Sequence, residues 1–321
     1  MESSIKTMNS LKTKIENLFM SQIQGWDIAQ KNYELLGSCK TRKLSNSNFS
    51  FILQKNYGRI KSSTSKTDEK SLKARPCFLC KSNRPFEQKD VKYKGETNSY
   101  EILVNPFPIF QKHFTIVSSE HTNQTIKNRE KDLLELTDIF EDYIVFFNGA
   151  NCGASAPDHM HFQAGKTDIL PIVNNFADIE KYSIQIETCK TKSLYSIMNM
   201  PFTGFYIKSE NEQDVYETLK LLLKELGEDK KLNIISWKKN NYYIIVIFPR
   251  IKHRPSIYFA NDSKRKLISP ASVEMSGLII TPIEKDFLNT NYSDLLSIFK
   301  EICYSKNQIE SVIQKITKNQ I

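Results

Sequence analysis

A short run, Asp158-His159-Met160-His161-Phe162-Gln163, carries the side chains best suited to chemistry. A neutral imidazole can attack phosphorus, and a nearby carboxamide can hydrogen-bond to phosphate oxygens as charge shifts. Side chains alternate across a strand, so His159, His161 and Gln163 are predicted to share one face, opposite two core residues. We therefore predict His161 and Gln163 as catalytic residues. The alternative is a half-exposed strand with incidental histidines.

The loop before this run is built from small residues, Asn148-Gly149-Ala150-Asn151-Cys152-Gly153-Ala154-Ser155. Small residues let backbone N–H groups approach a phosphate closely, and Ser155 adds a hydroxyl donor. By itself such a loop is more often a simple turn. Placed directly before the histidine run, it predicts phosphate binding by Asn148, Gly153 and Ser155.

A tight cysteine pair, Cys77-Phe78-Leu79-Cys80, has the spacing of metal ligands. A closed tetrahedral zinc site needs four ligands, and we predict that His121 and His159 complete it. Such a site would hold a structural zinc ion. The alternatives are His113 as a ligand, no metal, or a redox pair. The residues after Cys80 (Lys81-Ser82-Asn83-Arg84-Pro85) suit a metal knuckle better than the helix that follows a redox pair.

Periodicity predicts the elements that position these residues. The expected helices are 10–36 and 129–147, and a polar, Ser-rich loop spans 61–75. The expected strands are 49–53, 100–104, 114–117 and one that carries His159 to Gln163.

A second unit repeats the order of these elements after a spacer at 165–200. A strand at 204–207 precedes a helix at 212–226, a hairpin of strands 232–237 and 242–248, a strand at 273–281 and a closing helix at 292–318. Because strand, helix, strand, strand occurs twice, we predict an α+β chain with duplicated antiparallel sheets and packed helices. Three parts are expected: residues 1–60 as an N-terminal helix and strand, 61–175 as a catalytic half, and 200–321 as a degenerate second half.

Composition narrows the class of protein. The 321 residues are 40% hydrophobic, enough for a sizeable core, and the net charge is +9. The basic residues are spread along the chain, so the charge indicates anionic ligands such as nucleotides more than nucleic acid. No stretch is long and apolar enough for a membrane span, and the sparse cysteines indicate a reducing compartment, the cytoplasm.

These motifs resemble the histidine triad (HIT) superfamily, and within it the transferase branch of galactose-1-phosphate uridylyltransferases (GalT), ATP adenylyltransferases (dinucleoside polyphosphate phosphorylases) and GDP-hexose phosphorylases. The resemblance covers about residues 50 to 285, and its layout is closest to uncharacterised bacterial relatives of ATP adenylyltransferases. It implies that His161 is the nucleophile, that Cys77, Cys80, His121 and His159 bind zinc, and that Arg59 and Lys66 bind phosphate. Homodimers are common among such proteins.

The implied function is nucleotidyl transfer through a covalent nucleotidyl-histidine. The donor would be a nucleotide sugar or dinucleoside polyphosphate, and the acceptor phosphate or a sugar phosphate. Water gains from a general base, which Gln163 cannot be, whereas phosphate is already ionised. Transfer is therefore favoured over a HIT-type nucleotide hydrolase. A non-catalytic nucleotide- or nucleic-acid-binding zinc protein is the remaining alternative.

Overall fold

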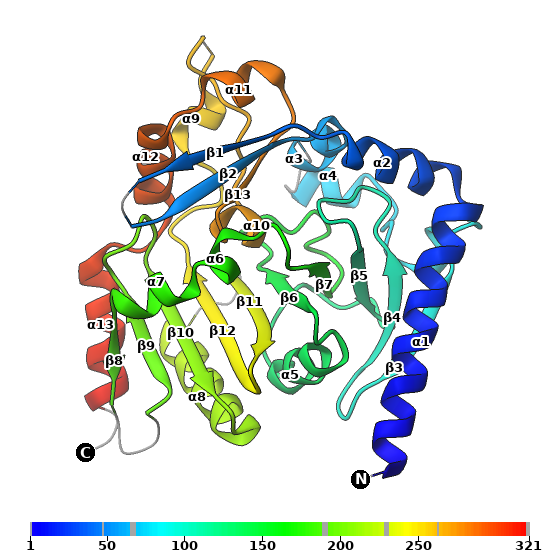
Figure 1. Cartoon of the computed structure of the whole chain (residues 1–321), viewed down its shortest axis with the longest axis horizontal. Coiled ribbons are helices and arrows are strands. Elements are labelled where there is room, and N and C mark those ends of the chain that lie inside the picture. Colours follow the sequence, from blue (N-terminus) through cyan, green and yellow to red (C-terminus); the bar gives the residue numbers. More distant parts are fainter. Residues whose placement is uncertain are drawn as a thin grey trace.

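The computed structural model describes residues 2–46, 48–64, 69–187, 192–227, 231–261 and 263–318. Its centre is an antiparallel sheet of ten strands (Figure 1). In spatial order these strands are β3 (Asp90–Lys94), β4 (Ser99–Val104), β5 (His113–Ser118), β7 (His161–Lys166), β6 (Tyr143–Asn148), β11 (Leu232–Lys239), β12 (Tyr242–Pro249), β10 (Gly204–Ser209), β9 (Leu194–Ile197) and β8 (Ser183–Ile186).

A smaller sheet joins a segment near the N-terminus to a segment in the C-terminal third of the chain. Strand β2 (Ser50–Lys55) pairs antiparallel with β1 (Thr41–Ser45) and parallel with β13 (Leu278–Thr281). In Figure 1 this sheet lies above the large one, beside α9 (Ser256–Phe259), α11 (Glu284–Asn289) and α12 (Tyr292–Ile302). The N-terminal strand expected at 49–53 is thus locked to the C-terminal third of the chain.

The large sheet contains the same arrangement twice, which confirms the predicted duplication. In the first half β7 lies between β5 and β6, and α5 (Glu130–Ile139) connects β5 to β6. In the second half β12 lies between β10 and β11, and α8 (Glu212–Leu226) connects β10 to β11. Pairing of β6 with β11 makes the two halves one continuous sheet.

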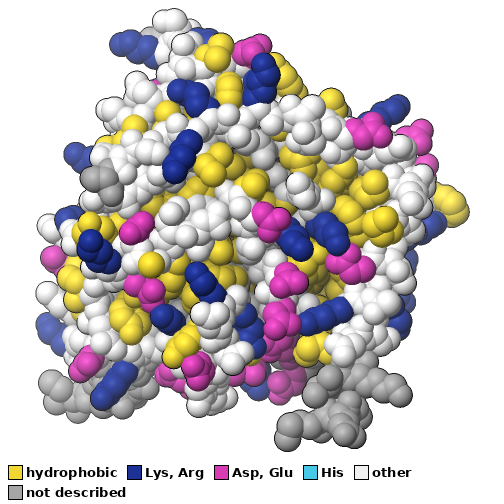
Figure 2. All heavy atoms as spheres, viewed as in Figure 1, with side chains coloured by type: hydrophobic (Ala, Val, Ile, Leu, Met, Phe, Trp, Pro, Cys, Tyr) yellow, Lys and Arg dark blue, Asp and Glu magenta, His cyan; other side chains and the backbone are white. Residues whose placement is uncertain are grey.

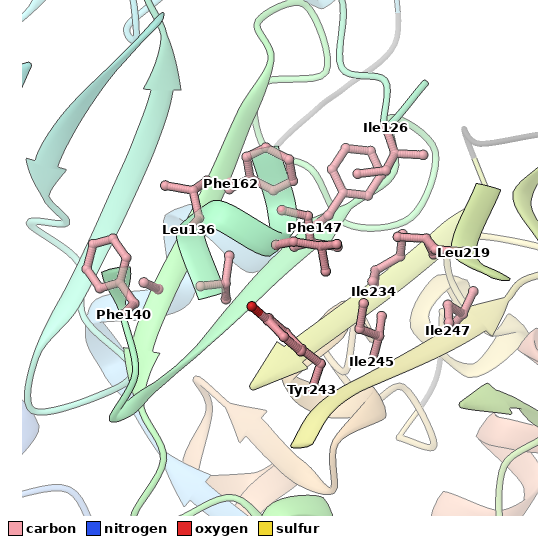
Figure 3. Close-up of a cluster of buried hydrophobic side chains, with 14 of the residues drawn as sticks. Ile126, Leu136, Phe140, Phe147, Phe162, Leu219, Ile234, Tyr243, Ile245 and Ile247 are labelled. Atoms are coloured by element: carbon pink, nitrogen blue, oxygen red, sulfur yellow. The ribbon is translucent and has the colours of Figure 1, made fainter. Parts of the chain in front are cut away.

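Both faces of the sheet are buried, because successive side chains of its central strands enter different cores. Phe147, Phe162, Ile234 and Ile245 pack on one face with residues of α1 (Glu2–Gly25), α5, α8 and α13 (Lys306–Lys318) (Figure 3). Met160 and Phe162 are fully buried in this core, as predicted. The other face packs on β2, β13 and α12, and on the short helices α6 (Pro171–Asn174), α7 (Phe176–Lys181) and α10 (Ser272–Met275).

The prediction of a helix at 129–147 was wrong for the second half of that range. The helix ends at Ile139, and Tyr143–Asn148 form β6, a central strand. The segment Tyr143-Ile144-Val145-Phe146-Phe147 is entirely aromatic and β-branched, and all of it is buried. Such a run favours a strand covered on both faces, and its apolar spacing was misread as one more helical turn.

Other boundaries also differ. The helix expected at 10–36 is interrupted at Trp26, which separates α1 from α2 (Asp27–Gly37), and that at 292–318 is interrupted at 303–305. The strand expected at 273–281 begins as α10, and Gly277, at φ +95°, turns the chain into β13. The loop expected at 61–75 contains α3 (Ile60–Ser63), which follows the 3-10 turn η1 (Tyr57–Arg59), and α4 (Glu69–Lys73). Strands β1, β3, β8 and β9 were not predicted, and the short 3-10 turn η2 (Lys81–Asn83) follows the cysteine pair.

The predicted hairpin of the second half is confirmed. Asn240 and Asn241 connect β11 to β12 with φ of 51° and 68°. Asparagine tolerates this left-handed conformation, which matches the twist of the paired strands.

One face of the molecule carries charged side chains of both signs (Figure 2). On the face shown in Figure 2, basic side chains are interspersed with acidic ones and do not gather into one patch. None of the described helices is both long and apolar enough to cross a bilayer.

Candidate functional site

His161 is the first residue of β7, not the middle of a strand that includes His159. Its side chain is 4% exposed and lines a cavity of about 650 Å³. Nδ1 lies 2.8 Å from the carbonyl oxygen of His159 and donates to it, so the lone pair is on Nε2. Within the described part of the chain Nε2 has no hydrogen-bond partner. Burial lowers the pKa of His161 to about 4, which keeps the ring neutral.

Gln163 follows two residues later and also lines the cavity. Its Oε1 lies 3.0 Å from Nε2 of His113, a fully buried residue of β5. The N–H of Ile109 points to Nδ1 of His113 (3.3 Å), so the hydrogen of this ring is on Nε2 and is donated to Gln163. Because its oxygen is occupied, Gln163 keeps its NH2 group for the cavity.

Asn148 ends β6 beside His161. Its amide is arranged like that of Gln163, with the oxygen occupied and the NH2 group left as a donor. Its Oδ1 accepts hydrogen bonds from Nδ2 of Asn233 (3.0 Å) and from the N–H of Ser272 (2.8 Å). The NH2 group of Asn148, which also lines the cavity, is thereby left as a donor. Two carboxamides on adjacent strands thus offer donors near one neutral imidazole.

A second glutamine, the buried Gln124, connects the ends of β6 and β7. It acts beyond Phe146 and Gln163, the last paired residues of these two strands. Nε2 of Gln124 donates to the carbonyl oxygens of Asn148 (2.9 Å) and His161 (3.0 Å), and its Oε1 accepts from the N–H of His161 (2.8 Å). Gln124 therefore fixes the backbone of the proposed nucleophile.

The loop from Gly149 to Ser155 borders the same cavity through Gly153, Ala154 and Ser155. Gly153 has φ +98°, and a Cβ there would meet Cβ of Ala271 at 2.4 Å. The glycine is thus required by close approach to α10, which sequence reasoning did not foresee. Arg75 ties the loop down by contacts to the Ser155 carbonyl (3.5 Å) and to Oδ1 of Asp158 (3.1 Å).

The cavity collects residues from far apart in the sequence. Arg59 lines it, as do Arg254 and Glu274 from the second half, whereas Lys66 lies outside the described residues. Arg59 donates to the carbonyl oxygen of Phe107 (2.8 Å). The cavity is also lined by apolar residues: Trp26, Ile28, Phe78, Leu79, Leu103, Pro106 and Phe107. A concave site with apolar walls and a few convergent polar groups is typical of a small-molecule ligand.

The four predicted metal ligands form one cluster, in which the ligand atoms all lie within 4.8 Å of one another. Nδ1 of His159 is 3.3 Å from Sγ of Cys77 and 3.5 Å from Sγ of Cys80, and Nδ1 of His121 is 3.1 Å from Sγ of Cys80. In a tetrahedral zinc site the nitrogen-to-sulfur edge is about 3.5 Å, so these separations fit. His113, the alternative ligand, lies instead beside Gln163.

The ligand atoms are also oriented for a metal ion. Nε2 of His159 lies 2.9 Å from the carbonyl oxygen of Ser118 and donates to it, which leaves the lone pair on Nδ1, facing the sulfurs. The same residue accepts the hydrogen of His161 through its carbonyl oxygen. The cluster can therefore bind a metal ion, and one of its residues fixes the imidazole in the cavity.

Sequence reasoning missed several residues of the site. His113 was treated only as a possible metal ligand or structural residue, and Gln124, Asn233 and Glu274 were not singled out. A glutamine or glutamate has no local signal, since only the fold places it beside a strand end. His113 had one signal, a histidine one residue before a predicted strand.

Comparison with known proteins supports the fold. A family described as a domain of unknown function (DUF4922) matches residues 18–166, and no curated protein matches the chain significantly. Crystal structures of the yeast Ap4A phosphorylase Apa2 in complex with AMP and with Ap4A match with a TM-score of 0.62. They are 17% and 18% identical, and the matches cover 92% of this chain and 96% and 98% of theirs. The chain therefore has the fold of this yeast phosphorylase, and the predicted α+β class with duplicated antiparallel sheets is confirmed.

Proposed function

We propose that the protein is a nucleotidyltransferase of the phosphorylase type, with His161 as nucleophile. Nε2 attacks the α-phosphorus of a nucleotide donor, a P–N bond forms, and the P–O bond to the leaving phosphate breaks. The leaving group departs as an anion and needs no proton. A second phosphate then forms a new P–O bond, and Nε2 leaves with the electron pair of the P–N bond.

The observation that carries this proposal is the direction of the hydrogen bonds around His161. Its Nδ1 is occupied by the His159 carbonyl, so Nε2 is the nitrogen left for the cavity. The NH2 groups of Gln163 and Asn148 are the donors for the non-bridging oxygens, whose charge grows in the transition state. The nucleotides in the yeast structures, AMP and Ap4A, support a nucleotide ligand.

Transfer is favoured over hydrolysis because neither carboxamide can act as a base toward water. His113, the other ring next to Gln163, donates its hydrogen, and burial lowers its pKa to about 3. An acceptor that is already ionised needs no such base.

We further propose that the metal ion is zinc, held by Cys77, Cys80, His121 and His159. With four protein ligands the site is closed, so zinc would stabilise the fold and supply no open coordination position. Phosphate binding by Arg59, Gly153, Ser155 and Lys66 is part of the same proposal.

Mass spectrometry of the intact protein tests the covalent step. After incubation with ADP, GDP, nucleotide sugars or Ap4A, we expect a mass increase of one nucleoside monophosphate, lost on addition of the acceptor. Initial rates should follow ping-pong kinetics. Absence of an adduct with every donor, together with sequential kinetics, would contradict the mechanism.

Replacement of His113 by phenylalanine tests how Gln163 is oriented. The ring volume is kept, but Oε1 of Gln163 loses its donor and the amide can rotate. We expect adduct formation to slow by about 100-fold, the scale of losing one oxyanion donor, with little change in KM for the donor.

A double-mutant cycle separates this positioning effect from damage to the fold. In a Gln163→Ala background, His113→Phe should slow adduct formation no further, because there is no amide left to orient. Equal slowing in both backgrounds would show that His113 acts only through stability.

A further inference from the structure

The turn that leads from β4 to β5 is held in shape by side chains from the N-terminal part of the chain. It forms no helix or strand, and Pro106 and Pro108 have no backbone N–H to donate. The carbonyl oxygens of four successive residues, 106 to 109, each accept a hydrogen bond from one side chain: in order, Asn32 (2.7 Å), Arg59 (2.8 Å), Asn56 (3.1 Å) and Gln54 (3.3 Å). Side chains far away in the sequence therefore set the orientation of each of these peptide units.

One of these peptide units lies between Asn56 and the ring next to Gln163. Nδ2 of Asn56 donates to the carbonyl oxygen of Pro108, and the N–H of Ile109, in the same peptide unit, points to Nδ1 of His113 (3.3 Å). The peptide bond is trans, so its C=O and its N–H point in opposite directions. The orientation in which the carbonyl oxygen reaches Asn56 is therefore also the one that aims the N–H at His113.

The hydrogen bonds from Asn56 to the cavity all run in one direction. Asn56 donates to the peptide unit, the peptide unit donates to His113, and Nε2 of His113 donates to Oε1 of Gln163 (3.0 Å). The NH2 group of Gln163 is the next donor, in the wall of the cavity. Because linked hydrogen bonds polarise one another, reversing the first bond favours reversal of the others.

Asn56 itself is buried and is not one of the residues that line the cavity. It directly follows β2, and its backbone N–H donates to the carbonyl oxygen of Thr281 in β13 (3.2 Å). Its Nδ2 also donates to Oε1 of Gln54 (3.0 Å), so both amide hydrogens have acceptors. The smaller sheet thus fixes Asn56, which can affect a reaction in the cavity only through other residues.

We propose that Asn56 is a positioning residue for nucleotidyl transfer, because it orients the peptide unit that directs the hydrogen of His113 to Gln163. The inference rests on the proposed function of His161 and Gln163. If the peptide unit turned over, its carbonyl oxygen would face Nδ1 of His113, and the ring hydrogen would be on Nδ1. Gln163 would then donate to Nε2 and turn its oxygen toward the cavity, where it would repel a phosphate oxygen instead of stabilising it.

Asn56→Asp is the sharpest variant, because it keeps the shape of the side chain and removes both amide hydrogens. The introduced carboxylate can only accept, so it repels the carbonyl oxygen of Pro108 and favours the reversed peptide unit. Asn56→Ala removes the donor without adding an acceptor, so its effect should be smaller. We expect adduct formation to slow about 100-fold in Asn56→Asp and about tenfold in Asn56→Ala, with KM for the donor within about threefold.

The position of the hydrogen on His113 measures the same effect without turnover. The chain has five histidines, so isotopic labelling of their ring nitrogens gives few NMR signals, and His113→Phe identifies those of His113. We expect the hydrogen on Nε2 in the wild type, on Nδ1 in Asn56→Asp, and a mixture in Asn56→Ala. Asn32→Asp is the matched control. It changes the donor to Pro106, whose peptide unit points its N–H at Asn105, so the His113 hydrogen should stay on Nε2.

Kinetics in a second background separate positioning from damage to the turn. In Gln163→Ala neither Asn56 variant should slow adduct formation further, because no amide is left to orient. Equal slowing in both backgrounds, or a His113 hydrogen that stays on Nε2 in both Asn56 variants, would show that Asn56 only stabilises the turn and would overturn the inference. Absence of an adduct even in the wild type would count against His161, and the ring signals would still decide the role of Asn56.

Discussion

Replacement of His161 by asparagine is expected to abolish the nucleotidyl adduct and to lower turnover by roughly 10⁴-fold or more, as for other enzymes that lose a nucleophile. Asparagine retains an N–H that can donate to the carbonyl oxygen of His159, so the local backbone should be kept. What disappears is the lone pair of Nε2. Nucleotide affinity should stay within about threefold, since the other residues that line the cavity are unchanged.

The experiment combines intact-mass spectrometry, single-turnover kinetics and nucleotide titration on the same preparation. Lys252→Ala is a suitable control, because Lys252 pairs with Glu301 and does not line the cavity. An adduct of unchanged mass and rate in His161→Asn would assign the nucleophile to another residue.

Replacement of Cys77 by serine is expected to remove the bound metal and to lower the melting temperature by at least about 10 °C. Binding of zinc to a four-ligand site contributes on the order of 10 kcal/mol, and a hydroxyl is a poor substitute for a thiolate. In a chain of this size each kcal/mol shifts the melting temperature by about 2–4 °C. Activity should fall too, because His159 holds the ring of His161.

Elemental analysis and calorimetric melting measure this effect, and Cys39→Ser is the matched control. Cys39 is a free thiol outside the metal cluster. We expect one zinc per chain in the wild type and the control, and none in Cys77→Ser. Freshly purified wild-type protein that contains no metal and melts at the same temperature as Cys77→Ser would refute a structural metal.

The candidate chemistry was readable from local sequence because its residues are clustered along the chain. Five consecutive residues contain both histidines and the glutamine, and only two residues separate the cysteines. Two other elements were predicted for the same reason, the antiparallel hairpin at Asn240 and Asn241 and helix α8. Each depends on residues that are close together in the sequence. Strand β6 was missed because an apolar run of about this length suits either a helix turn or a buried strand, and only its neighbours β7 and β11 decide.

The sequence by itself determined the types of residue in the site and the duplicated order of elements, since both are carried by short spacings. Only the tertiary structure decided which atoms are free to react. The carbonyl of His159, the ring of His113 and the amide of Asn233 each occupy one end of a polar side chain. The His159 carbonyl lies only two residues from His161, but the other two partners are brought in by sheet pairing between segments 50 and 85 residues apart. Hydrogen-bond direction across such distances is not encoded in any local pattern.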